Sequence, residues 1–457
     1  MGRRWRIFLL LLVLGVGLAW WLSGRGPEVA PGSVLVLELS GEYVDAPTPP
    51  LLARVLGEEE RSLLSLLSKL SMAERDERLQ AVLLHVRDLE MGWGKVQEVR
   101  DALVRLREAG RRTVAFLEPE GYGNAEYFLA SAAERVVMPP AARNPLLGLA
   151  GEYYFLGGLF EKLGIEIEYE RVGRYKSAVE TFAAEKMSPA NRDMTRSILD
   201  AIDDHFVAGI ARGRGLDAEA VRAAIDEGVT APERMLELGL IDEIAYRDEL
   251  FAGEGEVPEV EGPVYAGVDP ATLGFEPRAT FALVYASGPV LVGEGKRGRG
   301  GQKIIASETV AQAIEEAAGS GSFQAILLRI DSPGGSPLAS DRIWRAVRKA
   351  RQQGVPVVAS YSDVAASGGY YLSAGADRIV SHATTLTGSI GVFVIRPNLG
   401  ELFDKLSVGV ETMTRGARAE LLLASKPLSQ AAREVLRRDV QSVYDQFVSR
   451  VAEGRDM

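Results

Sequence analysis

The 457-residue sequence contains no cysteine and only three histidines, His85, His205 and His382. The absence of cysteine excludes disulfide bonds, thiol nucleophiles and thiolate metal sites. Three dispersed histidines argue against a multi-histidine metal centre, so we expect neither a metal nor another cofactor. Acidic residues outnumber basic ones, 63 to 52, and the resulting net charge of −11 argues against a nucleic-acid partner. The remaining composition, 47% hydrophobic and 25% charged, is that of a globular protein with two or three domains.

One long hydrophobic run stands at the N-terminus. Three arginines precede an apolar stretch over residues 7–22, and Trp20 and Trp21 lie near its end. With two more small residues the run reaches about 18 residues, the lower range for a helix that crosses a bilayer. The arginines predict a cytoplasmic N-terminus. A cleaved signal peptide is the alternative, but no convincing A-x-A site is present. We therefore expect residues 1–30 to be a single-pass anchor in the inner membrane, with the bulk of the chain on its periplasmic side.

The rest of the chain repeats itself with a period of about 243 residues. Three pairs of segments match in the same order: AVLLHV at 81–86 with AILLRI at 325–330, AEYFLASAAERVV at 125–137 with GGYYLSAGADRIV at 368–380, and LGGLFEKLGIEIEYERVG at 156–173 with NLGELFDKLSVGVETMTRG at 398–416. We expect a first repeat over 31–250, a linker rich in glycine, proline and glutamate over 251–278, and a second repeat over 279–457. The first repeat continues through residues 216–244, but the second repeat ends where the equivalent segment of about 30 residues would begin, which predicts a C-terminal truncation.

Both repeats alternate short aliphatic runs with helical stretches. VPVVASYS and DRIVSH, for example, enclose the helical stretch SGGYYLSAGA. Buried strands that alternate with helices indicate βαβ units and a mostly parallel sheet. The sequence therefore predicts an α/β protein with two tandem domains of one fold.

Two motifs of the second repeat favour catalysis. RIDSPGGSPLASDRIWRAV, at 329–347, predicts a strand that ends in a Gly-Gly turn before a helix, where the backbone can approach a ligand closely. DVAASGGYYLSAGAD, at 363–377, places Ser367 at a turn of small residues into a helix, the setting of an exposed nucleophile. Taken alone, the first motif can be an ordinary strand-to-helix turn, and Ser367 can be a helix N-cap.

Together with RVGRYKSAVETF at 171–182 and LTGSIGVF at 386–393, these motifs resemble the signal peptide peptidase A (protease IV) family in its long two-repeat form, with the Clp-protease/crotonase superfold. The resemblance implies a serine–lysine peptidase with Ser367 as nucleophile and Lys176 as general base. It implies that Ser389 hydrogen-bonds the lysine amine and that Gly335 and Gly368 form the oxyanion hole. It also implies signal peptides and other hydrophobic peptides as substrates, and a homo-oligomer, a tetramer.

The comparison of the two repeats supports the same pair independently. Asn124 stands opposite Ser367, and Ala419 stands opposite Lys176. The first repeat keeps the lysine and lacks the serine, whereas the second keeps the serine and lacks the lysine. DLEMGWGK replaces the Gly-Gly turn in the first repeat. Because a lysine with its ordinary pKa is protonated at neutral pH, this base needs burial that lowers its pKa.

Other interpretations remain open. His382 follows Ser367 closely enough to be considered as its base, although its context is typical of a strand end. The carboxylates Asp331, Asp341 and Asp363 near the motifs are expected to cap helices or to be solvated. A crotonase-type acyl-CoA enzyme and a catalytically inactive membrane-associated scaffold of the same fold are the alternative functions.

Overall fold

The computed structural model describes residues 27–45, 60–121, 123–295, 298 and 302–457, so the apolar run at 7–22 lies outside the described residues. Among these residues, no helix combines the length and the apolar character that a membrane span requires. The chain forms two compact units. The first contains the residues up to Met91 together with Glu98–Leu147 and Ala208–Arg278, and the second contains Gly92–Gln97, Gly148–Val207 and Ala279–Met457. The domain boundaries expected from the repeats stay a prediction.

The first unit is built on a parallel sheet with the strand order β2-β1-β3-β4-β5-β7, and β8 pairs with β1. Its strands are β1 (Ser33–Val44), β2 (Arg61–Ser62), β3 (Leu79–Glu90), β4 (Arg112–Leu117), β5 (Arg135–Met138), β7 (Glu243–Ile244) and β8 (Glu259–Glu261). Its helices are α3 (Leu63–Arg75), α5 (Asn124–Ala130), α9 (Ala218–Glu227), α10 (Pro232–Glu237) and α11 (Gly262–Tyr265), with the short 3-10 helices η2 (Arg247–Glu249), η3 (Ala252–Glu254) and η4 (Pro270–Leu273). Strand β4 is buried along nearly its whole length and β3 over most of its first eight residues, as in parallel sheets that are covered on both faces.

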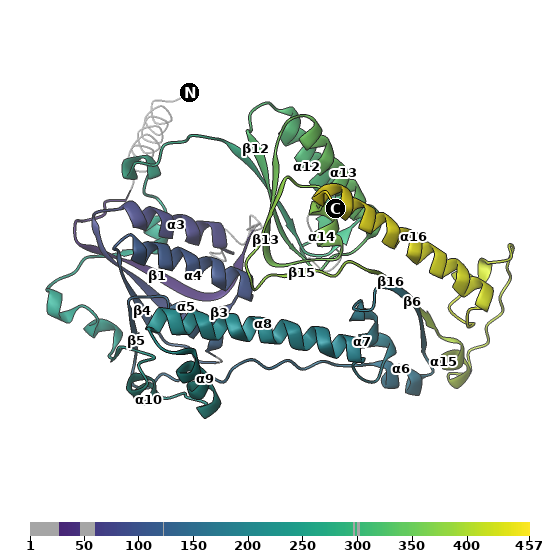
Figure 1. Cartoon of the computed structure of the whole chain (residues 1–457), viewed down its shortest axis with the longest axis horizontal. Helices are drawn as coiled ribbons and strands as arrows, with labels where there is room; N and C mark the ends of the chain where they lie inside the picture. Colours follow the sequence, from purple (N-terminus) through teal and green to yellow (C-terminus); the bar gives the residue numbers. More distant parts are fainter. Residues whose placement is uncertain (1–26, 46–59, 122, 296–297, 299–301) are drawn as a thin grey trace, which may run out of the picture. The chain divides into compact units, whose positions relative to one another are not determined.

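The second unit contains a second parallel sheet, with the order β14-β13-β12-β9 and with β15 paired to β13. Figure 1 labels β12, β13 and β15 of this sheet. Its strands are β9 (Phe281–Ser287), β12 (Ala325–Ser332), β13 (Val357–Ala366), β14 (Arg378–Val380), β15 (Leu386–Gly388), the pair β10 (Val290–Leu291) and β11 (Ile305–Ala306), and the pair β6 (Glu166–Val172) and β16 (Val392–Asn398). Its helices are α6 (Gly157–Leu163), η1 (Ser177–Val179), α7 (Glu180–Ala183), α12 (Ser307–Gly319), α13 (Pro337–Gln352), α14 (Gly368–Ser373), α15 (Gly400–Lys405), η5 (Ala419–Leu422) and α16 (Gln430–Arg455). Helices α4 (Trp93–Glu108) and α8 (Pro189–Arg214) have residues in both units.

The two sheets confirm the expected α/β fold class. The orders β1-β3-β4-β5 and β9-β12-β13-β14 match strand for strand, and all these pairings are parallel. Equivalent side chains also repeat a contact. Asp88 Oδ1 accepts the amide N–H of Gly121 at 3.0 Å, and Asp331 Oδ1 accepts that of Val364 at 3.2 Å. Such agreement in topology and detail is what an internal duplication produces.

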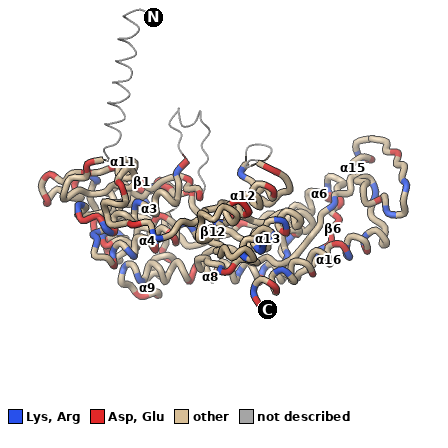
Figure 2. The backbone as a smooth tube through the Cα atoms, turned by 90° about the horizontal axis from the view of Figure 1, so that it is seen from above, with Lys and Arg blue, Asp and Glu red and all other residues tan. Residues whose placement is uncertain are grey.

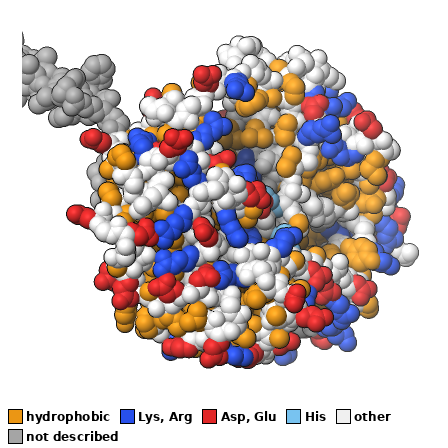
Figure 3. All heavy atoms as spheres, turned by 60° about the vertical axis from the view of Figure 1, so that its left-hand side comes forward, with side chains coloured by type: hydrophobic (Ala, Val, Ile, Leu, Met, Phe, Trp, Pro, Cys, Tyr) orange, Lys and Arg blue, Asp and Glu red, His pale blue; other side chains and the backbone are white. Residues whose placement is uncertain are grey.

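Helices α12 and α13 show how the second sheet is covered. Helix α13 buries Ala339, Ile343 and Val347 at helical spacing, because its apolar face packs on the core of the sheet. The two helices carry opposite charges: α12 contains acidic residues and α13 mainly basic ones, coloured red and blue on the backbone tube of Figure 2. Lys349 of α13 lies 3.1 Å from Glu315 of α12. On the face shown in Figure 3, charged side chains of both signs are mixed with groups of hydrophobic ones.

Candidate active site

Ser367 lies in a sharp turn where β13 ends and α14 begins. Its backbone has φ 53° and ψ −118°, a conformation that residues other than glycine rarely adopt. Two hydrogen bonds hold it there: its N–H donates to Gly388 O at 2.8 Å, and its carbonyl accepts the N–H of Tyr371 at 2.9 Å. The strain is thus imposed by β15 on one side and by the first turn of α14 on the other.

The predicted Gly-Gly turn follows β12 and lies against this serine. A Cβ added to Gly334 would stand 2.7 Å from the amide nitrogen of Gly368, and one added to Gly335 would stand 2.2 Å from Val290 O. Val290 N–H donates to Gly334 O at 2.9 Å, and Val290 O accepts the N–H of Ser336 at 2.8 Å. Only glycine fits between the Val290 backbone and the serine turn, with φ of 103° and 155° at the two positions.

Gly335 and Gly368 are direct neighbours in space. The amide nitrogen of Gly335 lies 2.9 Å from the point that a Cβ on Gly368 would occupy. Gly368 is the first residue of α14, and the first N–H groups of a helix have no partner within the helix. The turn therefore brings the backbone amides of Gly335 and Gly368 to the side of Ser367.

Lys176 follows β6 and reaches Ser367 with its amine. Nζ lies 2.9 Å from Ser367 Oγ, 2.9 Å from Ser389 Oγ and 2.9 Å from Ser389 O. The residue is only 6% exposed. Burial removes water from the ammonium group and lowers the pKa of Lys176 from 10.5 to about 8. The structure thus joins three of the residues that the sequence singles out.

Glycine 391 explains how the stem of the lysine is buried. A Cβ at this position would stand 3.2 Å from both Cβ and Cδ of Lys176 and 2.9 Å from Val172 O. The second glycine of the TGSIG motif therefore lets the backbone close over the lysine stem. Ser389, in the same motif, has a φ of 52°, and this turn presents both its hydroxyl and its carbonyl to Nζ.

The antiparallel pair β6–β16 holds the lysine segment beside the TGSIG segment. Val172 pairs with Val392, and the register continues to Glu166 opposite Asn398. Glu168, which is 3% exposed, forms ion pairs with Arg396 and Arg433 and accepts the N–H of Leu428. This buried carboxylate ties β6, β16 and α16 together.

Sequence reasoning missed one charged cluster next to the site. Lys95 Nζ lies 2.7 Å from Asp331 Oδ2 and 2.6 Å from Asp363 Oδ2. The expectation of a cap holds for Asp363, which accepts the Lys95 N–H at 2.9 Å in the first turn of α4. It is wrong for Asp331, which binds Lys95, and for Asp341, which accepts hydrogen bonds from Tyr371 and Arg450. The sequence offered one indication of this cluster, since Asp331 is a carboxylate at the carboxyl end of the predicted strand that became β12.

Comparison with known proteins places the chain in a family. The profile of peptidase family S49 matches residues 108–256 and 349–457. The chain belongs to this family. It is 35% identical over 99% of its length to a chloroplastic serine protease SPPA of Arabidopsis thaliana, and 27% identical over 98% to Protease 4 of Salmonella typhi. A putative signal peptide peptidase SppA of Enterococcus faecium is 38% identical over 29% of this chain.

These matches confirm the resemblance and the serine peptidase class. The chain spans 66% of the Arabidopsis relative, 75% of the Salmonella relative and 38% of the Enterococcus relative. The family profile matches one segment in each expected repeat, in line with the duplicated sheets.

Proposed function

We propose that this chain is a serine endopeptidase in which Ser367 attacks a peptide carbonyl and Lys176 is the general base. The observation that carries the proposal is the buried contact between Lys176 Nζ and Ser367 Oγ at 2.9 Å. A serine hydroxyl needs a base within hydrogen-bond reach, and a lysine qualifies only when it is partly neutral. A pKa of about 8 makes roughly a tenth of Lys176 neutral at pH 7.

Ser389 supports the base without adding a charge. A neutral amine has two N–H groups and one lone pair. Donation to Ser389 O and Ser389 Oγ leaves the lone pair directed at the Ser367 hydroxyl. In the proposed attack, Lys176 takes the Ser367 proton while Oγ bonds to the substrate carbonyl carbon. The resulting ammonium then donates its three N–H groups to Ser389 O, Ser389 Oγ and Ser367 Oγ.

The same lysine serves both halves of the reaction. Its ammonium protonates the leaving amine as the peptide bond breaks, which gives an acyl-enzyme on Ser367. A water molecule then attacks the ester with Lys176 as base, and the proton returns to Ser367 Oγ when the acid product leaves. The amides of Gly335 and Gly368 are proposed to donate to the carbonyl oxygen as negative charge develops on it. Loss of one such donor typically costs about 100- to 1,000-fold in kcat.

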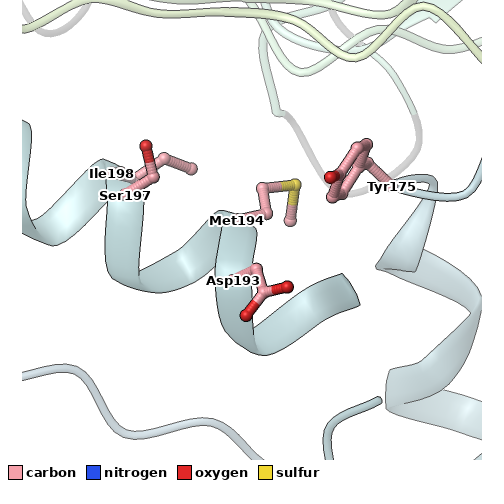
Figure 4. A pocket seen from close by; sticks show the side chains of 5 residues that line it. All are labelled: Tyr175, Asp193, Met194, Ser197 and Ile198. Atoms are coloured by element: carbon pink, nitrogen blue, oxygen red, sulfur yellow. The ribbon is translucent and has the colours of Figure 1, made fainter. Parts of the chain in front are cut away.

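Hydrophobic peptides, among them released signal peptides, are the proposed substrates. One relative is named a putative signal peptide peptidase. A pocket of about 390 Å³ opens beside the lysine segment, lined by Tyr175, Asp193, Met194, Ser197 and Ile198. In Figure 4 the Met194 side chain extends from α8 toward the Tyr175 ring. Tyr175 directly precedes Lys176, so the pocket is suited to hold an apolar side chain of a bound peptide.

The proposed location is the inner membrane, with the catalytic part of the chain on the periplasmic side. This rests on the arginines and the apolar run of residues 7–22. Anchoring would keep the enzyme close to peptides that leave the bilayer.

Self-association is proposed from two segments that align, by the repeat, with the paired strands β6 and β16 but are not themselves paired as strands in this chain. Residues 149–155 correspond to β16 and residues 409–415 to β6, and both segments are fully described. Their apolar side chains are exposed, with Tyr154 at 68%, Val410 at 45% and Met413 at 88%. Exposed strand-like edges invite pairing with another chain. We propose that 409–415 of one copy pairs with 149–155 of the next, as β6 pairs with β16.

Light scattering on the purified protein tests the assembly. Val410→Pro and Tyr154→Asp are each expected to reduce the mass toward that of one chain, and Leu422→Asp, an exposed apolar position outside both segments, is the control. Unchanged mass in both variants would contradict this pairing.

Covalent labelling of Ser367 tests the dyad. Detergent-solubilised protein is exposed to a serine-directed phosphonate, and the labelled peptide is identified by mass spectrometry. We expect labelling at Ser367 in the wild type and in Lys349→Ala, which removes an exposed lysine of α13. Ser367→Ala and Lys176→Ala are expected to remain unlabelled. A folded wild type without label would favour the inactive scaffold.

A further inference from the structure

The segment Gly92–Lys95 belongs to the first repeat by sequence but packs within the second unit. Its two glycines permit very close approach. A Cβ on Gly92 would stand 2.3 Å from the carboxyl carbon of Asp363, and one on Gly94 would stand 2.6 Å from Ser362 O. Trp93 packs edge-on against Phe206, with ring centroids 5.6 Å apart. The GWGK sequence is therefore shaped to lie against the strand that leads to Ser367.

This segment contacts three stretches of chain, each just before a residue of the proposed active site. Lys95 Nζ binds Asp331, which precedes the turn with Gly335, and it binds Asp363, which precedes Ser367. Trp93 O accepts the hydroxyl of Thr384 at 3.0 Å, in the loop that leads to Ser389. One short segment thus touches the base of every loop that supplies a group to the site, apart from the lysine segment itself.

Charge makes the Lys95 contact persistent. Burial alone would lower the pKa of Lys95, but the carboxylates of Asp363 and Asp331 outweigh burial and raise it above its ordinary value. The side chains of the three residues are between 10% and 23% exposed. Lys95 is consequently a permanent cation between two carboxylates, whereas Lys176, buried against hydroxyl and carbonyl oxygens, can lose its proton.

The first repeat supplies an internal comparison. Asp88, the counterpart of Asp331, accepts the amide N–H groups of Glu120 and Gly121, just as Asp331 accepts that of Val364. The strand-end carboxylate is therefore common to both repeats. The ion pair with a lysine is what distinguishes Asp331 from Asp88. This lysine, Lys95, comes from the segment of the first repeat that stands where the second repeat has its Gly-Gly turn.

We propose that Gly92–Lys95 is a brace for the catalytic loops and that Lys95 is a positioning residue for the peptidase reaction. By bridging Asp331 and Asp363 it fixes the glycine turn relative to the serine turn, which sets where the Gly335 amide stands with respect to Ser367 Oγ. Small displacements of such groups weaken transition-state stabilisation more than substrate binding. The inference rests on the proposed function, since the loops matter only if they carry the reaction.

Lys95→Met is the principal test, because methionine keeps the length of the side chain and removes its charge. We expect kcat toward a hydrophobic peptide to fall at least tenfold, KM to stay within threefold, and the rising limb of the pH profile to remain near pH 8. Lys95→Arg is expected to recover part of the activity, since a guanidinium can bridge two carboxylates. Gly94→Ala, which forces the segment away from Ser362 without changing any charge, is expected to resemble Lys95→Met.

Controls separate this role from mere folding and from failure of the proposed function. Asp88→Asn alters the equivalent carboxylate of the first repeat and is expected to keep wild-type kcat. Activities are normalised to Ser367 titrated with the phosphonate, and amide hydrogen exchange of 331–336 and 363–368 is expected to rise in Lys95→Met. Wild-type kcat per titrated serine in Lys95→Met, or unchanged exchange in both peptides, would overturn the brace. A wild type that does not label at all would remove the proposed function, and the inference with it.

Discussion

Lys176 and Ser367 are separated by 191 positions in the chain, and their Nζ and Oγ atoms lie 2.9 Å apart. Each comes from the repeat that lacks the other, but both lie in one compact unit, because the lysine segment packs with the second sheet. The amine is bound by hydroxyl and carbonyl oxygens of serine.

The pH profile should report the ionisation of Lys176. Because burial lowers the pKa of this lysine to about 8, the neutral base is scarce below pH 8 and predominates above it. We expect kcat/KM to rise about tenfold per pH unit below pH 7 and to level off above pH 9. Steady-state assays of the wild type from pH 5.5 to 9.5 measure this. A profile that is flat across pH 8, or that levels off near pH 6.5 as for a histidine, would contradict the lysine base.

Lys176 should reduce stability while enabling catalysis. Its pKa is lower in the folded chain than in the unfolded one, so the native state disfavours the cation. Below pH 8 the lysine is protonated in both the folded and the unfolded chain, and the full free-energy cost of burying the cation is present. Between pH 8 and 10.5 the folded lysine is neutral while the unfolded one is still charged, so this cost falls with rising pH until both are neutral. We expect Lys176→Met to raise the free energy of unfolding by about 2–3 kcal/mol at pH 7 and much less at pH 10. Urea titrations at both pH values test this, and an equal change at both would refute the linkage.

Gly335→Ala should damage both the turn and the reaction. Its Cβ would stand 2.2 Å from Val290 O at a φ of 155°, so the turn must move and the amide of residue 335 with it. We expect kcat to fall by about 100-fold or more, the loss typical of a displaced oxyanion donor. Gly319→Ala is the matched control, because a Cβ there has no neighbour within 4 Å. Retention of kcat by folded Gly335→Ala would remove this amide from the proposed oxyanion hole.

Glu168 should be essential for the β6–β16 pair that positions Lys176. Replacement by Gln leaves Arg396 and Arg433 around a neutral amide in a buried site, which is expected to cost about 3–5 kcal/mol. Glu170→Gln, on the same strand, breaks a pair with Arg437, which is 58% exposed, and should cost less than about 1 kcal/mol. Chemical denaturation compares the two variants. Equal stabilities would mean that the Glu168 cluster does not hold the strands.

The sequence was sufficient to predict mostly parallel sheets in two α/β domains and to single out the two residues now found in contact. Ser367 and Lys176 could be found because duplication provides an internal reference, in which Asn124 and Ala419 mark the missing partners. The aliphatic runs predict parallel strands because their burial on both faces leaves a continuous apolar pattern.

The contacts of Lys95 and the pairing of β6 with β16 could not be predicted in this way. Lys95 meets Asp331 and Asp363 across 236 and 268 positions, and nothing in the local pattern of GWGK identifies the surface against which its glycines pack. Similarly, the repeat alignment treats β6 as part of the first repeat. Its partner β16 belongs to the second repeat, so this strand pair joins the two repeats and no alignment of one repeat with the other reveals it.

The order of the groups along the chain has a consequence during synthesis. Translation runs from the N-terminus, so the lysine segment leaves the ribosome long before the serine turn and the TGSIG segment do. A nascent chain that carries Lys176 alone has a base without a nucleophile, and its strand β6 still lacks β16. Peptide-bond cleavage by the proposed dyad can therefore begin only after residue 398 has been made and paired. The divided repeats thereby delay proteolytic competence until the segment of the second repeat that contains Ser367, Ser389 and β16 has been synthesised.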